Sequence, residues 1–165
     1  MALSVGVKAP DFTLETTTAK RVFLPELLKG GAAVLAFFKV GCPTCQYAFP
    51  YLDRLFQLHK DEPVTFLGIS QDDASNTEAF VKKYGITFPV ALDDPKQYLA
   101  SNAYKLTNVP TTYLVDSDGK IQVSSVGWVR NEVEDLDRRL SALSDHREPH
   151  PIFKPGEEIA EYKAG

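Results

Sequence analysis

The chain has 165 residues, about the length of one domain, and is long enough to fold around its own hydrophobic core. Hydrophobic residues make up 44% of it and charged residues 24%, which excludes a largely disordered chain. The 18 basic and 22 acidic side chains give a net charge of −4, so nucleic acid is not an expected partner. No apolar stretch reaches the roughly 18 residues that a membrane-spanning helix needs.

The N-terminal residues bear on where the protein works. The segment MALSVGVKAPDF contains neither the basic part nor the apolar part of an export signal. We therefore expect a cytoplasmic protein, or a periplasmic one if a signal peptide has been removed.

The N-terminal region predicts a β-hairpin followed by a helical turn. Residues 12–15 and 20–23 have the composition of two short strands separated by a threonine-rich turn. Residues 24–28 predict one turn of helix, which the Gly30-Gly31 pair ends.

The next region predicts a strand-helix-strand unit. Residues 33–38 form an unbroken apolar run, which is typical of a strand that is covered on both faces. Pro43 suits the first turn of a helix that reaches about His59, a residue placed at the negative end of the helix dipole. Residues 64–69 predict a second buried strand, parallel to the first.

Two further helices are predicted after this unit. A Ser-x-x-Glu capping box that begins at Ser75 predicts a helix over residues 75–84. The Asp94-Pro95 pair predicts the start of a second helix, over residues 94–103.

The C-terminal region predicts two strands, a helix and a tail. Residues 111–115 and 121–126 are strands joined by a tight Asp-Ser-Asp-Gly turn, and an apolar stripe follows from Asn131. The order of elements predicts one α/β domain with a mixed sheet over residues 1–144. Residues 145–165 are rich in proline and predict an extended tail rather than a second domain.

The chain has two cysteines, Cys42 and Cys45, placed where the apolar strand gives way to the helix. A disulfide between them would close almost no loop, so stabilisation of the fold is a poor explanation for the pair. The first turn of a helix leaves backbone N–H groups unpaired and favours a thiolate at Cys42. Cys45 lies one helical turn deeper on the same side. We therefore interpret Cys42 as the attacking sulfur and Cys45 as the resolving one.

Two other roles compete with a redox role for this pair. A zinc site could add His146 and His150, although about a hundred residues separate them from the cysteines. The cysteines could instead be small buried hydrophobic residues. A pair at the junction of a strand and a helix favours the redox role over both, so neither a metal nor an organic cofactor is expected.

Four segments of the chain, taken in order, resemble one family of proteins. They are GVKAPDF at 6–12, FFKVGCPTC at 37–45 with FPYL following, YGITFPV at 84–90 and VPTTYLVDSDGK at 109–120. Over about residues 5–127 the chain resembles the thioredoxin-fold redoxins, specifically the TlpA/ResA-like thiol-disulfide oxidoreductases within the broader AhpC/TSA-redoxin group. The resemblance implies a thioredoxin-like fold, in which a mixed central sheet is flanked by helices. The N-terminal β-hairpin and the C-terminal extended arm follow from the residues described above.

The resemblance also implies how a substrate binds. It implies that the Val109-Pro110 peptide is cis and lies beside the cysteines. In the family the backbone of the residue before this proline pairs with an extended segment of the substrate, a form of strand addition. Substrate contacts are therefore expected at Val109, Pro110, Pro43 and Thr44.

Several residues near the cysteines depart from the family pattern. Ala36 and Ala48 occupy places where family members often carry a buried carboxylate that helps to deprotonate the resolving thiol. Lys39, three residues before Cys42, is a candidate to favour the thiolate in its stead, and it fits equally well as a solvated cation. A proline directly after the first cysteine is similar to glutaredoxin-like and DsbA-like pairs, whose potentials are less reducing.

The predicted activity is thiol-disulfide exchange. Cys42 attacks a disulfide of a partner, a mixed disulfide forms, and Cys45 displaces the partner. The expected partners are proteins that bear disulfides or dithiols, together with a reducing or oxidising redox partner. The direction of electron flow and the oligomeric state stay open.

Two alternative functions also stay open. The first is a peroxiredoxin-like thiol peroxidase with Cys42 as the peroxidatic and Cys45 as the resolving cysteine. Peroxiredoxins hold the peroxide with a Pro-x-x-x-Thr-x-x-Cys arrangement, whereas this chain has Leu35 and Lys39 at the proline and threonine positions. The second is a non-catalytic interaction domain that docks partners on the sheet edge and the C-terminal arm.

Overall fold

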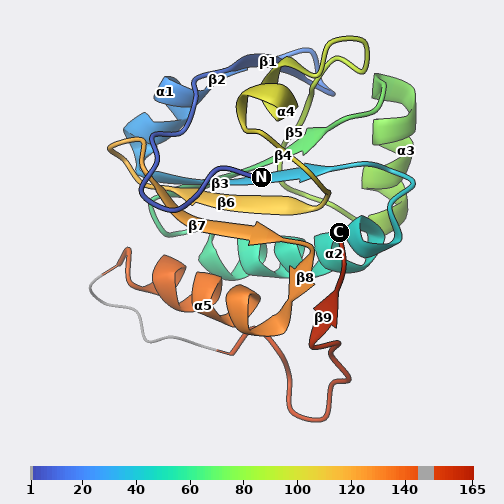
Figure 1. Ribbon diagram of the computed structural model, residues 1–165. Coiled ribbons are helices and arrows are strands. Elements are labelled where there is room, and N and C mark those ends of the chain that lie inside the picture. Colours follow the sequence, from blue (N-terminus) through green and yellow to red (C-terminus); the bar gives the residue numbers. More distant parts are fainter. Residues whose placement is uncertain (1, 145–150) are drawn as a thin grey trace.

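A mixed sheet runs through the centre of the structure (Figure 1). The computed structural model describes residues 2–144 and 151–165. The strands of the sheet are β1 (Thr13–Thr16), β2 (Arg21–Phe23), β3 (Ala32–Phe38), β4 (Val64–Ser70), β5 (Val90–Leu92), β6 (Thr111–Val115) and β7 (Ile121–Val126). They lie in the order β2-β1-β5-β4-β3-β6-β7, with β3 parallel to β4 and antiparallel to β6. The mixed α/β sheet that the sequence predicts is confirmed.

Strand β3 is buried on both faces, as its unbroken apolar run predicts. All seven of its residues are buried. Since successive side chains of a strand point to opposite faces, Val34 and Phe38 join one core cluster and Leu35 and Phe37 join the other. The strand therefore separates two hydrophobic cores and holds the residues that follow it at a fixed place.

Helices cover each face of the sheet (Figure 1). The helices are α1 (Leu24–Leu27) with the 3-10 turn η1 (Leu28–Gly30), α2 (Pro43–His59), α3 (Ala74–Tyr84), α4 (Leu99–Ala103) and α5 (Arg130–Ser141). The core under α2 and α5 contains Leu52, Leu55, Leu136 and Leu140, and Phe80 of α3 joins it. Helices α1 and α4 lie on the opposite face. Within the part of the chain that the structure describes, no helix is long and apolar enough to cross a bilayer.

The described part of the tail packs against the domain. Ile152 and Phe153 are buried in the core cluster under α2 and α5. Strand β9 (Tyr162–Lys163) pairs antiparallel with β8 (Trp128–Val129), which links β7 to α5. Residues 145–150 lie outside the described residues, and with them the two histidines of the zinc alternative.

Helices α3 and α4 begin at other residues than the sequence predicts. The capping box at Ser75 is wrong, because the carboxylate of Asp73 accepts the Asn76 N–H at 2.8 Å and caps α3 two residues earlier. Helix α4 begins at Leu99 rather than at Asp94, because Tyr98 adopts a left-handed conformation (φ 49°) that separates the preceding turn from the helix. Strand β5 has only three residues, too few to produce a periodic pattern.

Candidate functional site

The two loops that carry the predicted site residues meet at one end of the sheet. Strand β3 ends at Phe38 and leads through three residues to Cys42 and α2, whereas β6 begins directly after Pro110. Phe37 is paired with Thr111 in the antiparallel β3–β6 ladder. The loop after β3 and the loop before β6 therefore lie side by side, which brings Cys42 and Val109 together.

Cys42 is the N-cap residue of α2. Its backbone is extended, Pro43 follows in the first turn, and its sulfur accepts the backbone N–H of Cys45 at 3.1 Å. A sulfur in this position takes up one of the N–H groups that a helix start leaves unpaired. The residue is half-buried, and both cysteines are free thiols in this structure. The Cys42 sulfur is therefore accessible, and a backbone N–H is already positioned to donate a hydrogen bond to its thiolate form.

Cys45 lies inside the protein, one turn along α2. It is fully buried and packs in the same core cluster as Ala36 and Ala48. Burial raises the pKa of the Cys45 thiol well above its usual range, and its hydrogen bond with Cys42 acts in the same direction. Cys45 is therefore held as a neutral thiol close to Cys42, which suits a sulfur that reacts second.

The loop before β6 presents a carbonyl to the attacking sulfur. The Val109-Pro110 peptide is cis, which confirms the expectation from the family resemblance. The Val109 carbonyl oxygen lies 3.5 Å from Cys42 Sγ and accepts its S–H. Pro110 is buried, whereas Val109 is half-buried and remains within reach of a ligand.

The other predicted site residues, Pro43, Thr44 and Lys39, also lie beside Cys42, and each has different surroundings. Pro43 is exposed beside Cys42. Thr44 is buried, and its hydroxyl donates to the carbonyl oxygen of Ala164 in the tail at 2.6 Å. The Lys39 ammonium lies 5.8 Å from the ring centroid of Tyr98, a cation–π contact. Its proposed effect on the Cys42 thiol stays a prediction.

A cavity of about 600 Å³ lies at the meeting point of these loops. Its wall contains all the predicted site residues that face solvent and also residues that the sequence did not predict, among them Gln71, Asn108, Ala164 and Gly165. Gln71 directly follows β4, whose end lies beside the end of β3 because the two strands are parallel. That register offers a signal for Gln71, since ligands bind at the carboxyl ends of parallel strands.

A larger cavity of about 710 Å³ lies elsewhere, between β1 and α4. Its wall is acidic and includes Asp11, Glu15, Asp72 and Asp93, with no cysteine among the residues that line it. Since the sequence predicts chemistry at the cysteine pair, the smaller cavity beside Cys42 is the candidate site.

Comparison with known proteins supports the fold and the family to which the sequence points. Residues 5–124 match the sequence profile of the AhpC/TSA family. The chain is 30% identical over 143 residues to the thiol-disulfide oxidoreductase ResA of Geobacillus thermodenitrificans, which covers 86% of this chain and 79% of that protein. It is 35% identical over 121 residues to ResA of Bacillus subtilis, with 73% of this chain and 66% of that protein covered.

A solved structure gives the same result for the fold. The crystal structure of a putative thiol:disulfide interchange protein DsbE from Chlorobium tepidum superposes with a TM-score of 0.76 at 27% sequence identity. The match covers 86% of this chain and 99% of that one. The thioredoxin-like fold that the sequence predicts is therefore confirmed.

Proposed function

Because this chain belongs to the AhpC/TSA family, we propose that it is a thiol-disulfide oxidoreductase that exchanges the Cys42-Cys45 dithiol with disulfides of partner molecules. One observation carries the proposal. The accessible Cys42 sulfur caps α2 and accepts the backbone N–H of Cys45, whose own thiol is buried, at 3.1 Å, and the Val109 carbonyl faces the same sulfur from the loop before β6. Such an arrangement separates an attacking sulfur from a resolving one.

The first step forms a mixed disulfide. The Cys42 thiolate attacks one sulfur of the partner's disulfide, a bond forms between Cys42 and that sulfur, and the other sulfur leaves as a thiolate. The Cys45 N–H stabilises the Cys42 thiolate before attack. An extended segment of the partner lies along Val109, whose position next to Cys42 brings the scissile bond within reach.

The second step releases the partner. Cys45 gives up its proton, which passes to the departing sulfur of the partner, and attacks Cys42. The Cys42-Cys45 bond forms while the mixed disulfide breaks, so one partner disulfide becomes two thiols and one dithiol becomes a disulfide. Because the pKa of Cys45 is raised, its deprotonation accompanies this step rather than preceding it. A dithiol partner returns the protein to its reduced form by the reverse exchange.

Two cysteine variants test the proposal. Cys42→Ser should lower the rate constant of disulfide exchange by at least about a thousandfold, because a hydroxyl is not a nucleophile at neutral pH. Cys45→Ala should accumulate the mixed disulfide with the partner, which non-reducing gels and mass spectrometry detect. Both variants should keep the circular-dichroism spectrum of the parent. Normal exchange by Cys42→Ser, or the absence of a trapped species with Cys45→Ala, would contradict the proposed function.

The peroxidase alternative gains no support from the residues around Cys42. Leu35, at the peroxiredoxin proline position, is fully buried in β3. Lys39, at the threonine position, lies against Tyr98. Oxidation of Cys42 by hydrogen peroxide should therefore be no faster than that of a free thiol, as stopped-flow kinetics would measure.

A further inference from the structure

Residues 152–160 of the tail, which we call its base, are held firmly against the domain. Phe153 packs against Trp128 with the ring centroids 6.1 Å apart, and Ile152 is buried beside it. The indole N–H of Trp128 donates to the Ala160 carbonyl at 2.6 Å, and the Ala160 N–H donates to the hydroxyl of Tyr47 on α2 at 3.0 Å. The base is therefore anchored by apolar burial and by hydrogen bonds to two elements of the domain.

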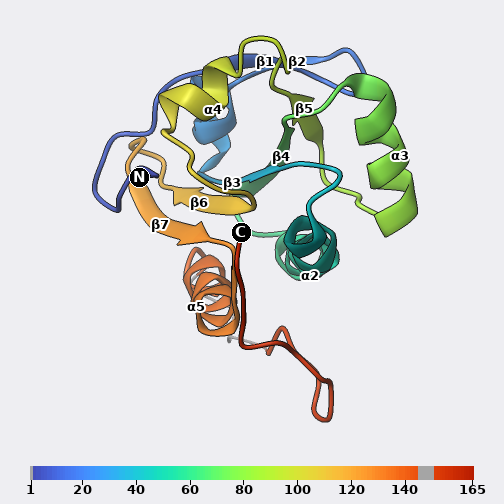
Figure 2. The same ribbon diagram turned by 45° about the vertical axis from the view of Figure 1, so that its right-hand side comes forward.

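Residues 162–165, which we call the strap, lead from this base into the candidate site. The chain runs along β8 and ends between β7 and the start of α2 (Figure 2). The Thr44 hydroxyl donates to the Ala164 carbonyl at 2.6 Å, and the Asn108 side-chain amide donates to the Gly165 carbonyl at 3.1 Å. The strap thus touches both loops of the site, the one that carries the cysteines and the one that carries Val109.

Glycines on both sides let the strap approach the site closely. A Cβ atom on Gly127, which has a φ of +77°, would lie 2.6 Å from the Lys163 carbonyl oxygen and 2.9 Å from the Gly165 nitrogen. A Cβ atom on Gly165 would lie 2.9 Å from the Val109 carbonyl oxygen. The strap backbone therefore lies directly on the backbone of residue 109, where the proposed function needs a substrate segment to lie.

The strap is held less firmly than its base. All of its side chains are exposed, so it buries little apolar surface. Its attachment consists of the two-residue β8–β9 ladder, the hydrogen bonds from Thr44 and Asn108, and the Lys163 ammonium 4.9 Å from the Tyr47 ring centroid. A segment held in this way opens locally at little cost, whereas the anchored base stays in place.

We propose that the strap is an internal competitor for the groove beside Val109, so that the site reacts readily with small disulfides and slowly with disulfides in folded proteins. The inference rests on the proposed function. The strap occupies the place for strand addition, which a protein substrate needs, but it only borders the cavity of about 600 Å³ into which Cys42 opens. A small disulfide enters that cavity with the strap closed, whereas a protein segment must first displace it.

Two substitutions of one residue isolate the backbone pairing of the strap. Lys163→Pro removes the backbone N–H of a β9 residue that pairs with Trp128, and Lys163→Ala removes the same side chain but keeps the N–H. The reduced proteins are mixed with insulin or with 2-hydroxyethyl disulfide, and the loss of free thiols is followed by mass spectrometry after acid quenching. A third variant lacks residues 162–165, all exposed, and retains every buried residue of the tail.

If the strap is closed in about nine molecules of ten, its loss raises the rate constant with insulin by about tenfold. We expect this increase for Lys163→Pro and for the shortened variant, and less than about a twofold change for Lys163→Ala. All three should change the rate constant with 2-hydroxyethyl disulfide by less than about twofold. An increase in the shortened variant alone still supports the strap, since a proline can be accommodated at the end of a ladder.

Other results overturn the proposal. If neither Lys163→Pro nor the shortened variant changes the ratio of the two rate constants, or if both rate constants change together, the strap does not compete with protein substrates. If the parent protein reacts with neither disulfide, the proposed function itself fails, and the competition has no reaction to act on. The two failures are therefore distinguished by the parent protein alone.

Discussion

The two ends of α2 hold polar groups in opposite ways. At its start, Cys42 is half-buried at the mouth of a cavity, and its sulfur has contacts with two backbone groups. At its end, His59 is fully buried, with Nε2 2.5 Å from Asp137 Oδ1 on α5 and Nδ1 3.5 Å from Glu62 Oε2. One end leaves a reactive atom within reach of other molecules, and the other surrounds its imidazole with side chains.

The difference indicates that one end of α2 stabilises the fold and the other end carries the reactive sulfur. The contact between His59 and Asp137 joins α2 to α5 inside the protein, where a hydrogen bond is strong because water does not compete. The contact therefore stabilises the packing of α2 on α5 at the end of the helix that lies away from the two cysteines. We therefore expect substitutions at the His59 end to change stability and substitutions at the Cys42 end to change reactivity.

Removal of the Asp137 carboxylate tests the buried end and should have the largest effect on folding. Asp137→Ala removes the carboxylate that the fully buried His59 imidazole contacts at 2.5 Å, which should lower the free energy of unfolding by about 3 kcal/mol. Urea denaturation followed by circular dichroism measures the change. The rate of disulfide exchange at 25 °C should stay within about twofold of the parent, because the cysteines are at the other end of the helix.

Asp135 on the same helix provides a matched control. Its carboxylate is exposed and pairs with Arg139 at 2.8 Å. Asp135→Ala should therefore lower the free energy of unfolding by less than about 0.5 kcal/mol. Equal losses of stability in the two variants would mean that burial of the His59 contact does not matter.

The reactive end can be tested by comparing its two sulfurs. Iodoacetamide at pH 8 should alkylate Cys42 at least about thirtyfold faster than Cys45, because Cys45 is buried and its pKa is raised. Peptide mapping by mass spectrometry separates the two sites. Because the raised pKa keeps Cys45 protonated, its alkylation should still accelerate as the pH increases from about 8 to about 9.5.

Alkylation in concentrated urea is the control for this comparison. Unfolding exposes both cysteines, so their rate constants should then agree within about threefold. If Cys42 and Cys45 already react equally fast in the folded protein, the distinction between an attacking and a resolving sulfur is lost.

The parts of the site that could be predicted from the sequence are local. The junction of a buried strand and a helix placed Cys42 and Cys45, and the register of β3 against β6 then brings Val109 to them. The cis peptide before Pro110 followed from the family resemblance. Each of these depends on a short run of residues with a recognisable pattern.

The remaining contacts join residues that are far apart in the chain. Thr44 and Ala164 are 120 residues apart, and His59 and Asp137 are 78 apart. No periodicity links such positions, because the contacts exist only once the helices and the tail have packed. The start of α4 is similar, since the buried Asp93 carboxylate accepts the N–H groups of Ala100 and Ser101, whereas the sequence predicted that the helix starts at Asp94.

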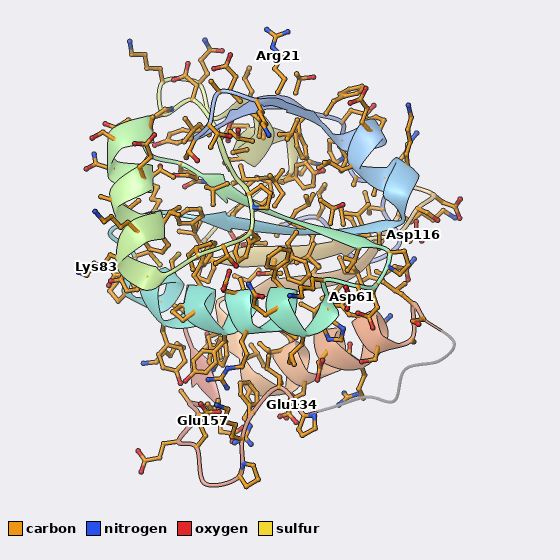
Figure 3. The ribbon with its side chains drawn as sticks, turned by 180° about the vertical axis from the view of Figure 1, so that it is seen from behind. Arg21, Asp61, Lys83, Asp116, Glu134 and Glu157 are labelled. Carbon is orange, nitrogen blue, oxygen red and sulfur yellow. The ribbon has the colours of Figure 1, made fainter. Side chains whose placement is uncertain are left out.

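A third polar contact of α2 lies between its two ends and is only partly buried. Arg54 donates to both carboxylate oxygens of Glu157, at 2.7 and 2.8 Å. Figure 3 shows Glu157 on the tail below α2, whereas Asp61 lies just beyond the end of the helix. This paired arrangement holds the base of the tail to the outside of α2, where salt and water weaken it.

The contact between Arg54 and Glu157 should contribute least to stability, and its contribution should depend most clearly on pH. The hydrogen bonds from Arg54 lower the pKa of the Glu157 carboxyl from 4.5 to about 2. Because the pKa is lower in the folded protein, the pair stabilises the tail fully above about pH 4.5, and this stabilisation is lost as the pH falls towards 2.

A carbon-13 NMR titration of the Glu157 carboxyl should give a midpoint near pH 2, and Arg54→Met should raise this midpoint most of the way to the ordinary value. Arg138→Met removes an arginine that contacts Asp135 instead, and it should leave the midpoint unchanged. A midpoint that is the same in Arg54→Met as in the parent would show that another group lowers the pKa, and that the middle of α2 does not hold the tail.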